Sequence, residues 1–316
     1  MQINEFKSSY NLQALKGNMF LFLAAFAWGT TFVVQRTAMD HMGPFFYSGL
    51  RFLLGSIFLL PIALYRVRNR RPSEWQREKL GKWLPLWGSC LAGLLICLGI
   101  NLQQTGLIYT TAGNAGFITG LYVVIVPFLG IFFGFRISLG VWIGAPLAAI
   151  GLYLLSVTQG FTLTPGDAWI LASAFVWAVQ VLTVGLLSPK IDSIVLAFGQ
   201  SFVCAVLSLI LAVILEDTSL AAIRTAWFEI AFGGIISVGV GFTLQVVGQK
   251  YSPPSYAAII LQLEAVIAAL AGWFFLNEIM SSRALAGAVL MLFGMLIAQM
   301  LPTWKTLKPA LLPMPK

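Results

Sequence analysis

Ten apolar runs of roughly twenty residues follow one another along the chain and limit what it can fold into. About 20 helical residues span the ~30 Å hydrocarbon core of a bilayer, and only helices and closed barrels satisfy their backbone hydrogen bonds there. Charged residues make up 9% of the chain, against about 25% in soluble domains. We therefore expect an all-α membrane protein with ten transmembrane helices, at residues 18–37, 45–65, 83–104, 112–134, 139–158, 167–187, 193–215, 227–247, 254–276 and 282–301.

The basic residues predict the orientation, because loops rich in Lys and Arg stay on the cytoplasmic side. With the N-terminus inside, 15 basic residues fall on inside segments, and only Arg36, Arg224 and Arg283 fall outside. Residues 1–17 and 302–316 are then a cytoplasmic N-terminal segment and a cytoplasmic tail. The net charge of +8 faces the anionic headgroups of membrane lipid, so it does not indicate a nucleic-acid partner.

The chain is an internal duplication. Residues 99–138 match residues 241–280 at an offset of 142, with 14 identities in 40 positions. An offset of 149 aligns Trp28 with Trp177 in the first helix of each copy. The units are five-helix repeats at 18–158 and 159–301. Because five is odd, the second repeat enters the membrane from the opposite side, and such inverted repeats are typical of secondary transporters.

Glu264 and Arg51 are charged residues inside predicted spans. Glu264 lies about 15 Å from the cytoplasmic end of the ninth span, where a charged carboxylate costs at least a few kcal/mol. It could bind a proton, a cationic group of a solute or a partner side chain, or it could hydrogen-bond neighbouring helices as a structural group. Arg51 lies within about 6 Å of the same depth, so an Arg51–Glu264 charge pair is one expectation. Snorkelling of Arg51 to the outer headgroups is the other.

Polar and aromatic side chains gather on the helices that the repeat equates. The spacing of Asn114, Ile118 and Tyr122 matches that of Tyr256, Ile260 and Glu264, which puts each set on one helix face. Single amides in a membrane can simply hydrogen-bond helices together, but a symmetric set favours a shared central site. The predicted substrate-binding residues are Trp28, Asn101, Asn114, Tyr122, Trp177, Gln180, Gln245, Tyr256 and Glu264.

Several other chemistries have no support in the sequence. It has no GxxxxGK[ST] phosphate-binding loop, and His41, its only histidine, falls in a predicted outside loop. Cys90, Cys97 and Cys204 lie inside apolar runs without metal-binding spacing. We therefore expect no enzyme, no metal site and no cofactor.

Short motifs along the chain resemble one family. Ala27-Trp28-Gly29-Thr30-Thr31-Phe32, Arg51-Phe52-Leu53-Leu54, Thr111-Ala112-Gly113-Asn114-Ala115 and the segment from Leu263-Glu264 to Asn277-Glu278 resemble the drug/metabolite transporter superfamily, specifically its EamA-type ten-span permeases. The resemblance runs from about residue 17 to 301. It implies a bacterial inner-membrane permease with both termini in the cytoplasm and a central cavity, often an exporter of amino acids or amphipathic metabolites.

Arg136 and Ala265 depart from the family pattern, which often has an acidic residue and a proline at these places, so no particular substrate follows from the resemblance. The sequence favours a secondary transporter of a small organic solute, expected to export and acting as a monomer or homodimer, with the proton as one candidate coupling ion. The alternative is a lipid flippase-like or non-transporting scaffold protein. A lipid path would require a polar groove that opens sideways into the bilayer.

Overall fold

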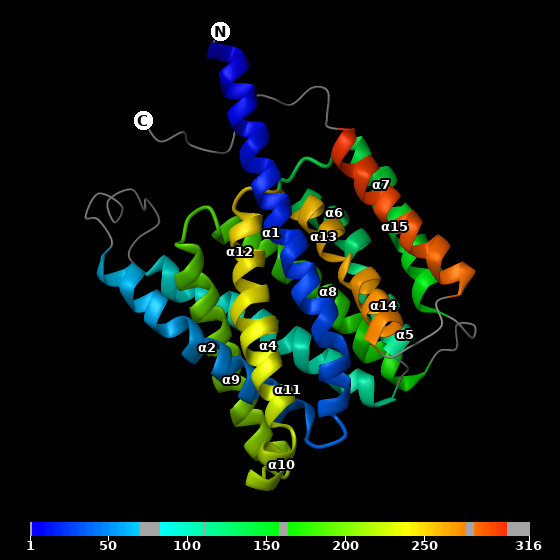
Figure 1. The fold of residues 1–316 in the computed structure, drawn as a ribbon. Coiled ribbons are helices and arrows are strands. Elements are labelled where there is room, and N and C mark those ends of the chain that lie inside the picture. The colour runs from blue at the N-terminus through cyan, green and yellow to red at the C-terminus, as the bar shows by residue number, and fades with distance from the viewer. Residues whose placement is uncertain (1, 70–82, 110–111, 158–163, 276–280, 302–316) are drawn as a thin grey trace.

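The computed structural model describes residues 2–69, 83–109, 112–157, 164–275 and 281–301, and all of its regular elements are helices (Figure 1). The elements are α1 (Gln2–Ala38), α2 (Pro44–Arg68), α4 (Leu84–Tyr109), α5 (Ala112–Gly120), α6 (Tyr122–Phe132), α7 (Leu139–Ser156), α8 (Pro165–Leu187), α9 (Ser193–Leu215), α10 (Leu220–Thr225), α11 (Trp227–Phe232), the π-helix η1 (Gly233–Phe242), α12 (Thr243–Gln249), α13 (Pro254–Leu261), α14 (Glu264–Phe275) and α15 (Ser282–Met300).

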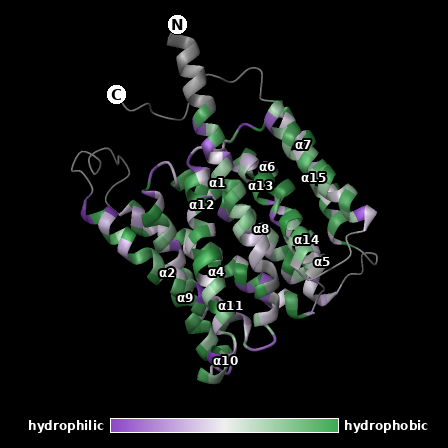
Figure 2. Cartoon of the chain, in the orientation of Figure 1, coloured by the Kyte–Doolittle hydropathy of each residue, from purple (hydrophilic) through white to green (hydrophobic). Residues whose placement is uncertain are grey.

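The chain is a multi-pass membrane protein. Within the described residues, nine helical segments are long and apolar enough to cross a bilayer, and they coincide with the second to tenth predicted spans. The first predicted span, 18–37, lies inside the long helix α1. Large apolar side chains are exposed on the outside of the bundle, among them Phe132 and Val213. Apolar residues line the helices throughout, and hydrophilic residues gather mainly at their ends and in loops (Figure 2).

Two of the predicted continuous helices are broken, at positions that the offset of 142 equates. Leu121 separates α5 from α6, and Gln262 and Leu263 separate α13 from α14. At each break a backbone N–H bonds three residues back, from Leu121 to Ile118 (3.2 Å) and from Leu263 to Ile260 (3.1 Å). Such tighter bonds mark short 3₁₀-type distortions within a helix. The breaks also meet in space, because a β-carbon on Gly120 would collide with the Gln262 side chain.

Helices α7 and α15 pack side by side along one edge of the bundle (Figure 1). A β-carbon on Gly144 would collide with the carbonyl oxygen of Gly294, and one on Gly294 would lie 2.7 Å from the Gly144 oxygen. Gly151 and Gly287 exclude each other's β-carbons in the same way. Small residues permit such close approach of helices in a membrane. After a one-residue slip in the repeat, an offset of 143 equates Gly144 with Gly287 and Gly151 with Gly294, so the two contacts are equivalent.

A second reciprocal set joins α1 to α12 and α4 to α8. A β-carbon on Gly17 would lie 3.0 Å from the carbonyl oxygen of Gly248, and a β-carbon on Gly248 would lie 2.9 Å from the carbonyl oxygen of Gly17. A β-carbon on Gly106 would lie 3.0 Å from the carbonyl oxygen of Gly166, and a β-carbon on Gly166 would lie 2.6 Å from the carbonyl oxygen of Gly106. The repeat equates Gly17 with Gly166 and Gly106 with Gly248, so the two crossings are equivalent.

The N-terminus of α2 is capped by a residue distant in sequence. Gly43 provides no side-chain cap, and the backbone N–H groups of Phe45 and Phe46 donate to the two carboxylate oxygens of Glu216, each at 2.8 Å. The equivalent helix α9 is capped by its own Asp192. A carboxylate at a helix N-terminus pairs unsatisfied N–H groups and complements the helix dipole.

Glu216→Ala is therefore expected to lower the free energy of unfolding by about 1–2 kcal/mol, the usual effect of losing an N-terminal cap. Thermal unfolding of the purified protein in detergent measures the change. Asp217→Ala is the matched control, because Asp217 is the exposed neighbour. Equal shifts in the two variants would contradict the capping role.

Candidate functional site

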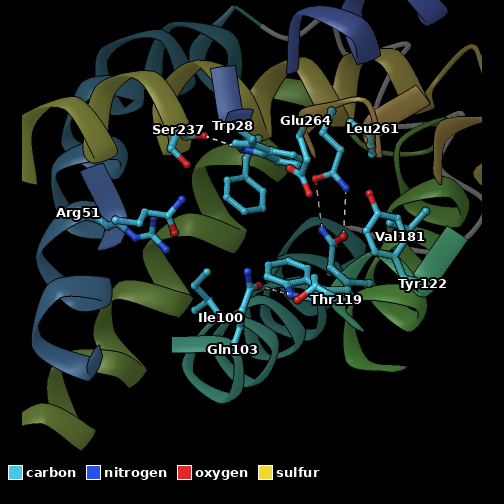
Figure 3. Close-up of a pocket in the computed structure, with 15 residues that line it drawn as sticks. Trp28, Arg51, Ile100, Gln103, Thr119, Tyr122, Val181, Ser237, Leu261 and Glu264 are labelled. Atoms are coloured by element: carbon cyan, nitrogen blue, oxygen red, sulfur yellow. Dashed lines mark hydrogen bonds between the residues drawn. The ribbon is translucent and has the colours of Figure 1, made fainter. Parts of the chain in front are cut away.

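A cavity lies at the meeting point of the two halves of the chain, lined by residues of α1, α2, α4, α5, α6, α8, η1, α12, α13 and α14 (Figure 3). Its volume is about 70 Å³, well above the ~10–15 Å³ that a cavity needs to hold one water molecule. Its lining residues are Trp28, Gln35, Arg51, Ile100, Gln103, Thr119, Tyr122, Trp177, Gln180, Val181, Ser237, Phe242, Gln245, Leu261 and Glu264.

Aromatic rings form one part of the cavity wall. The Phe242 ring lies between two indoles, with centroids 4.9 Å from Trp28 and 6.3 Å from Trp177. Each indole N–H is bonded: Trp28 donates to the backbone oxygen of Ser237 (3.1 Å) and Trp177 to Gln103 Oε1 (2.9 Å). These bonds hold the rings in place and turn their apolar faces into a rigid surface suited to an apolar part of a solute.

Gln180 and Gln245 form another part of the wall. Gln180 Nε2 donates to Gln245 Oε1 (3.4 Å), and Gln245 Nε2 donates to Gln180 Oε1 (3.0 Å). The pair links α8 to α12, and both side chains are buried. Amides paired in this way bridge helices, but each oxygen can still accept a second hydrogen bond from a solute.

Glu264 is the first residue of α14, directly after the helix break. Its carboxyl group points into the cavity (Figure 3). No described residue forms an ion pair or a hydrogen bond with this carboxyl. An unpaired carboxylate in a low-dielectric site is unfavourable unless a proton or a cation joins it. The site is therefore suited to bind one of the two.

Arg51 lines the same cavity but does not pair with Glu264. In Figure 3 the two side chains lie on different sides of the cavity, with Trp28 between them, and no ion pair joins them among the described residues. The expected charge pair is thus not formed. The Arg51 guanidinium carbon lies 5.0 Å from the Tyr47 ring centroid and 5.4 Å from that of Phe52. Arg51 is 1% exposed, so it does not snorkel to the surface either.

Ten of the fifteen described residues that line the cavity form five pairs that the repeat offsets equate: Trp28 with Trp177, Ile100 with Phe242, Gln103 with Gln245, Thr119 with Leu261, and Tyr122 with Glu264. A cavity lined by equivalent positions from both copies lies where the copies face each other. The chemistry differs where the pairs differ, above all at Tyr122 and Glu264.

Two predicted site residues that the structure describes, Asn101 and Tyr256, are not among those that line the cavity. Asn101 Nδ2 donates to the Cys97 carbonyl oxygen (2.8 Å) and to Ser208 Oγ (2.9 Å), so it connects α4 to α9. The Tyr256 hydroxyl donates to Ser138 Oγ (2.9 Å). The Asn114 side chain falls outside the described residues.

The helix break explains why Tyr256 and Glu264 do not share a face. The i, i+4, i+8 spacing assumes one continuous helix, whereas Gln262 and Leu263 interrupt it between α13 and α14. Among the lining residues that the sequence prediction omitted, Phe242 and Ser237 lie in the π-helix η1. Such helices occur frequently at functional sites.

A multi-pass helical protein with a polar and aromatic cavity between equivalent halves is typical of membrane transporters. Comparison with known proteins identifies the family: the EamA-like transporter family matches residues 15–157 and 164–300. The chain belongs to the EamA-like transporter family, and it is a membrane transporter.

Relatives cover nearly the whole chain. An uncharacterized transporter of Archaeoglobus fulgidus is 31% identical over 92% of this chain and 87% of its own length. The uncharacterized transporter YoaV of Bacillus subtilis is 23% identical over 84% of this chain and 91% of its own length. A crystal structure at 20% identity covers 90% of this chain and 96% of its own, with a TM-score of 0.74, so the fold is shared.

Proposed function

We propose that this chain is a secondary transporter that carries a small organic metabolite across the membrane, with a proton or a cationic group of the solute bound at Glu264. The observation that carries the proposal is the Glu264 carboxyl, which lies in a cavity between two equivalent halves and has no ion-pair or hydrogen-bond partner among the described residues. Secondary transporters bind solute and coupling ion near the membrane midplane, at broken helices between their repeats. The breaks before Tyr122 and Glu264 fit that arrangement.

The proposal includes ten transmembrane helices in two inverted repeats, residues 18–158 and 159–301, with α1 supplying the first span. The reciprocal glycine contacts support it. In a two-fold arrangement residue i of one copy contacts residue j of the other, and j contacts i in return. The pairs Gly144–Gly294 and Gly151–Gly287 have that relation. A two-fold relation between units of five spans requires opposite orientations in the membrane.

The substrate-binding set that we propose is the predicted residues that line the cavity: Trp28, Tyr122, Trp177, Gln180, Gln245 and Glu264. Their aromatic, amide and carboxyl groups suit an amphipathic solute with at least one polar end. We place the protein in a bacterial inner membrane with both termini in the cytoplasm, and we propose export as the direction. The positive charge of the predicted inside loops supports the orientation.

A flux screen tests the transport proposal. Purified protein in proteoliposomes would be tested against a panel of radiolabelled metabolites, with and without a pH gradient, beside empty liposomes. We expect saturable flux of at least one amphipathic metabolite, and stimulation by the gradient if a proton is the coupling ion. Absence of protein-dependent flux for the whole panel would contradict the proposal.

The topology makes a separate prediction. In a variant without native cysteines, a cysteine at position 217 should react with a membrane-impermeant maleimide in intact cells. A cysteine at position 74 should react only after lysis, because its segment is strongly basic and basic segments stay inside. Labelling of position 74 in intact cells, with position 217 protected, would reverse the orientation.

A further inference from the structure

Arg51 differs from an ordinary arginine of a membrane helix. It is the eighth residue of α2, about 10 Å from the start of the helix, and it is 1% exposed. Long basic side chains near helix ends normally extend to the headgroups. Arg51 is instead turned inward and lines the cavity (Figure 3).

The described surroundings of Arg51 provide no negative charge. Its guanidinium lies against the rings of Tyr47 and Phe52, and its Nε has no hydrogen-bond partner. No acidic side chain lies within ion-pair distance among the described residues. Glu216 is occupied with the cap of α2. Contact with aromatic faces stabilises a cation by about 0.5–2 kcal/mol, which is less than the several kcal/mol that burying one charge costs.

The equivalent position shows that the fold does not need this charge. The offset of 149 equates Arg51 with Gln200, which is fully buried on α9 and does not line the cavity. A neutral amide therefore fits the same place in the second copy. The cation is present only in the copy where the side chain reaches the cavity, which favours a role toward a ligand.

We propose that Arg51 is the anion-binding residue of the cavity, and that the transported solute carries a carboxylate which the guanidinium binds. This inference rests on the proposed transport function and specifies one end of its solute. A guanidinium presents parallel N–H donors that match the two oxygens of a carboxylate. The carboxylate neutralises Arg51, and the apolar body of the solute lies along the rings of Trp28 and Phe242.

Binding of matched probes to the purified full-length protein tests the inference without requiring transport. The probes are 3-phenylpropanoate, its neutral analogue 3-phenylpropanamide, and inorganic phosphate, and the readout is the dissociation constant from ligand-dependent thermal unfolding. We expect wild-type protein to bind the acid at least about tenfold more tightly than the amide. Arg51→Gln should weaken acid binding at least about tenfold, since it removes one partner of a buried charge pair.

Arg66→Gln is the matched control, because Arg66 is an exposed arginine of the same helix and should bind the acid as wild type does. Arg51→Lys keeps the charge but not the paired donors, so intermediate affinity is expected. If Arg51→Gln does not fold, the inference is tested by comparing the affinity for the acid with the affinity for the amide, in wild-type protein and in Arg51→Lys. Four results would each overturn the inference: equal affinity of wild-type protein for acid and amide, no binding of the acid, tighter binding of phosphate than of the acid, or wild-type affinity for the acid in Arg51→Gln.

The two proposals can fail separately. Binding of the acid without flux of any solute in proteoliposomes would remove the transport proposal and keep the role of Arg51. Flux of neutral or cationic solutes by a protein that does not bind the acid would keep the transport proposal and overturn the role of Arg51.

Discussion

Glu264→Gln is expected to reach the membrane in a folded form and to lose at least about tenfold of its solute flux, equivalent to ~1.4 kcal/mol in the rate-limiting barrier. Glutamine keeps the size and the hydrogen-bonding capacity of the side chain but removes its charge and its proton. The carboxyl lines the cavity and has no ion-pair or hydrogen-bond partner among the described residues, so little of the fold depends on it. A group that binds a proton or a cationic solute cannot be replaced by an amide.

The measurement is solute flux per amount of folded protein, made in proteoliposomes across roughly pH 5.5 to 8. The pH range matters because a carboxyl that exchanges a proton makes flux depend on pH. Tyr122→Phe is the matched control at the equivalent position, where it removes one hydroxyl from the same cavity wall. We expect it to change flux less than Glu264→Gln does. Unchanged flux and an unchanged pH profile in Glu264→Gln would reduce Glu264 to a structural group.

Gly151→Ala is expected to destabilise the protein by about 1–3 kcal/mol, the usual effect of adding a methyl group to a fully packed interface. The new β-carbon would lie 2.6 Å from the Gly287 oxygen and 2.8 Å from Met291, so α7 and α15 would have to separate. Gly287→Ala should have a similar effect, because the contact is reciprocal and its β-carbon would collide with the carbonyl oxygen of Gly151 and the backbone nitrogen of Leu155. Thermal unfolding in detergent and the yield of monodisperse protein measure both.

Gly116→Ala is the control for the same substitution at a site with space. Among the described residues, no atom outside its own helix lies within 4 Å of a β-carbon there, and alanine favours a helix over glycine by up to about 1 kcal/mol. We expect unchanged or slightly higher stability. If Gly116→Ala destabilises as much as Gly151→Ala, loss of glycine itself rather than helix crossing is responsible.

The positions of the membrane spans could be predicted because the bilayer imposes one length on every segment. Nine of the ten predicted spans correspond to described apolar helical segments, and their ends differ by a few residues. The offset comparison also identified cavity residues without a structure. Trp28 with Trp177 and Tyr122 with Glu264 were equated from sequence alone, and all four line the cavity.

The helix breaks were not predictable from local sequence, and they changed which faces meet. The break at Gln262 and Leu263 contains neither glycine nor proline, and it forms where the Gln262 side chain packs over Gly120. Asn101 looked like a cavity residue because its neighbours in the chain are polar, but the rotation of α4 turns it toward Ser208 on α9.

The sequence by itself determined the helical class, the span positions and the duplication, because the thickness of the bilayer and the repeat are properties of residue order along the chain. The tertiary structure decided which polar groups pair with one another and which remain open. Gln180 and Gln245 are paired, whereas Arg51 and Glu264 line one cavity without forming an ion pair. Pairing depends on how each helix is rotated and where it is broken, and both are set by close packing between helices distant in sequence.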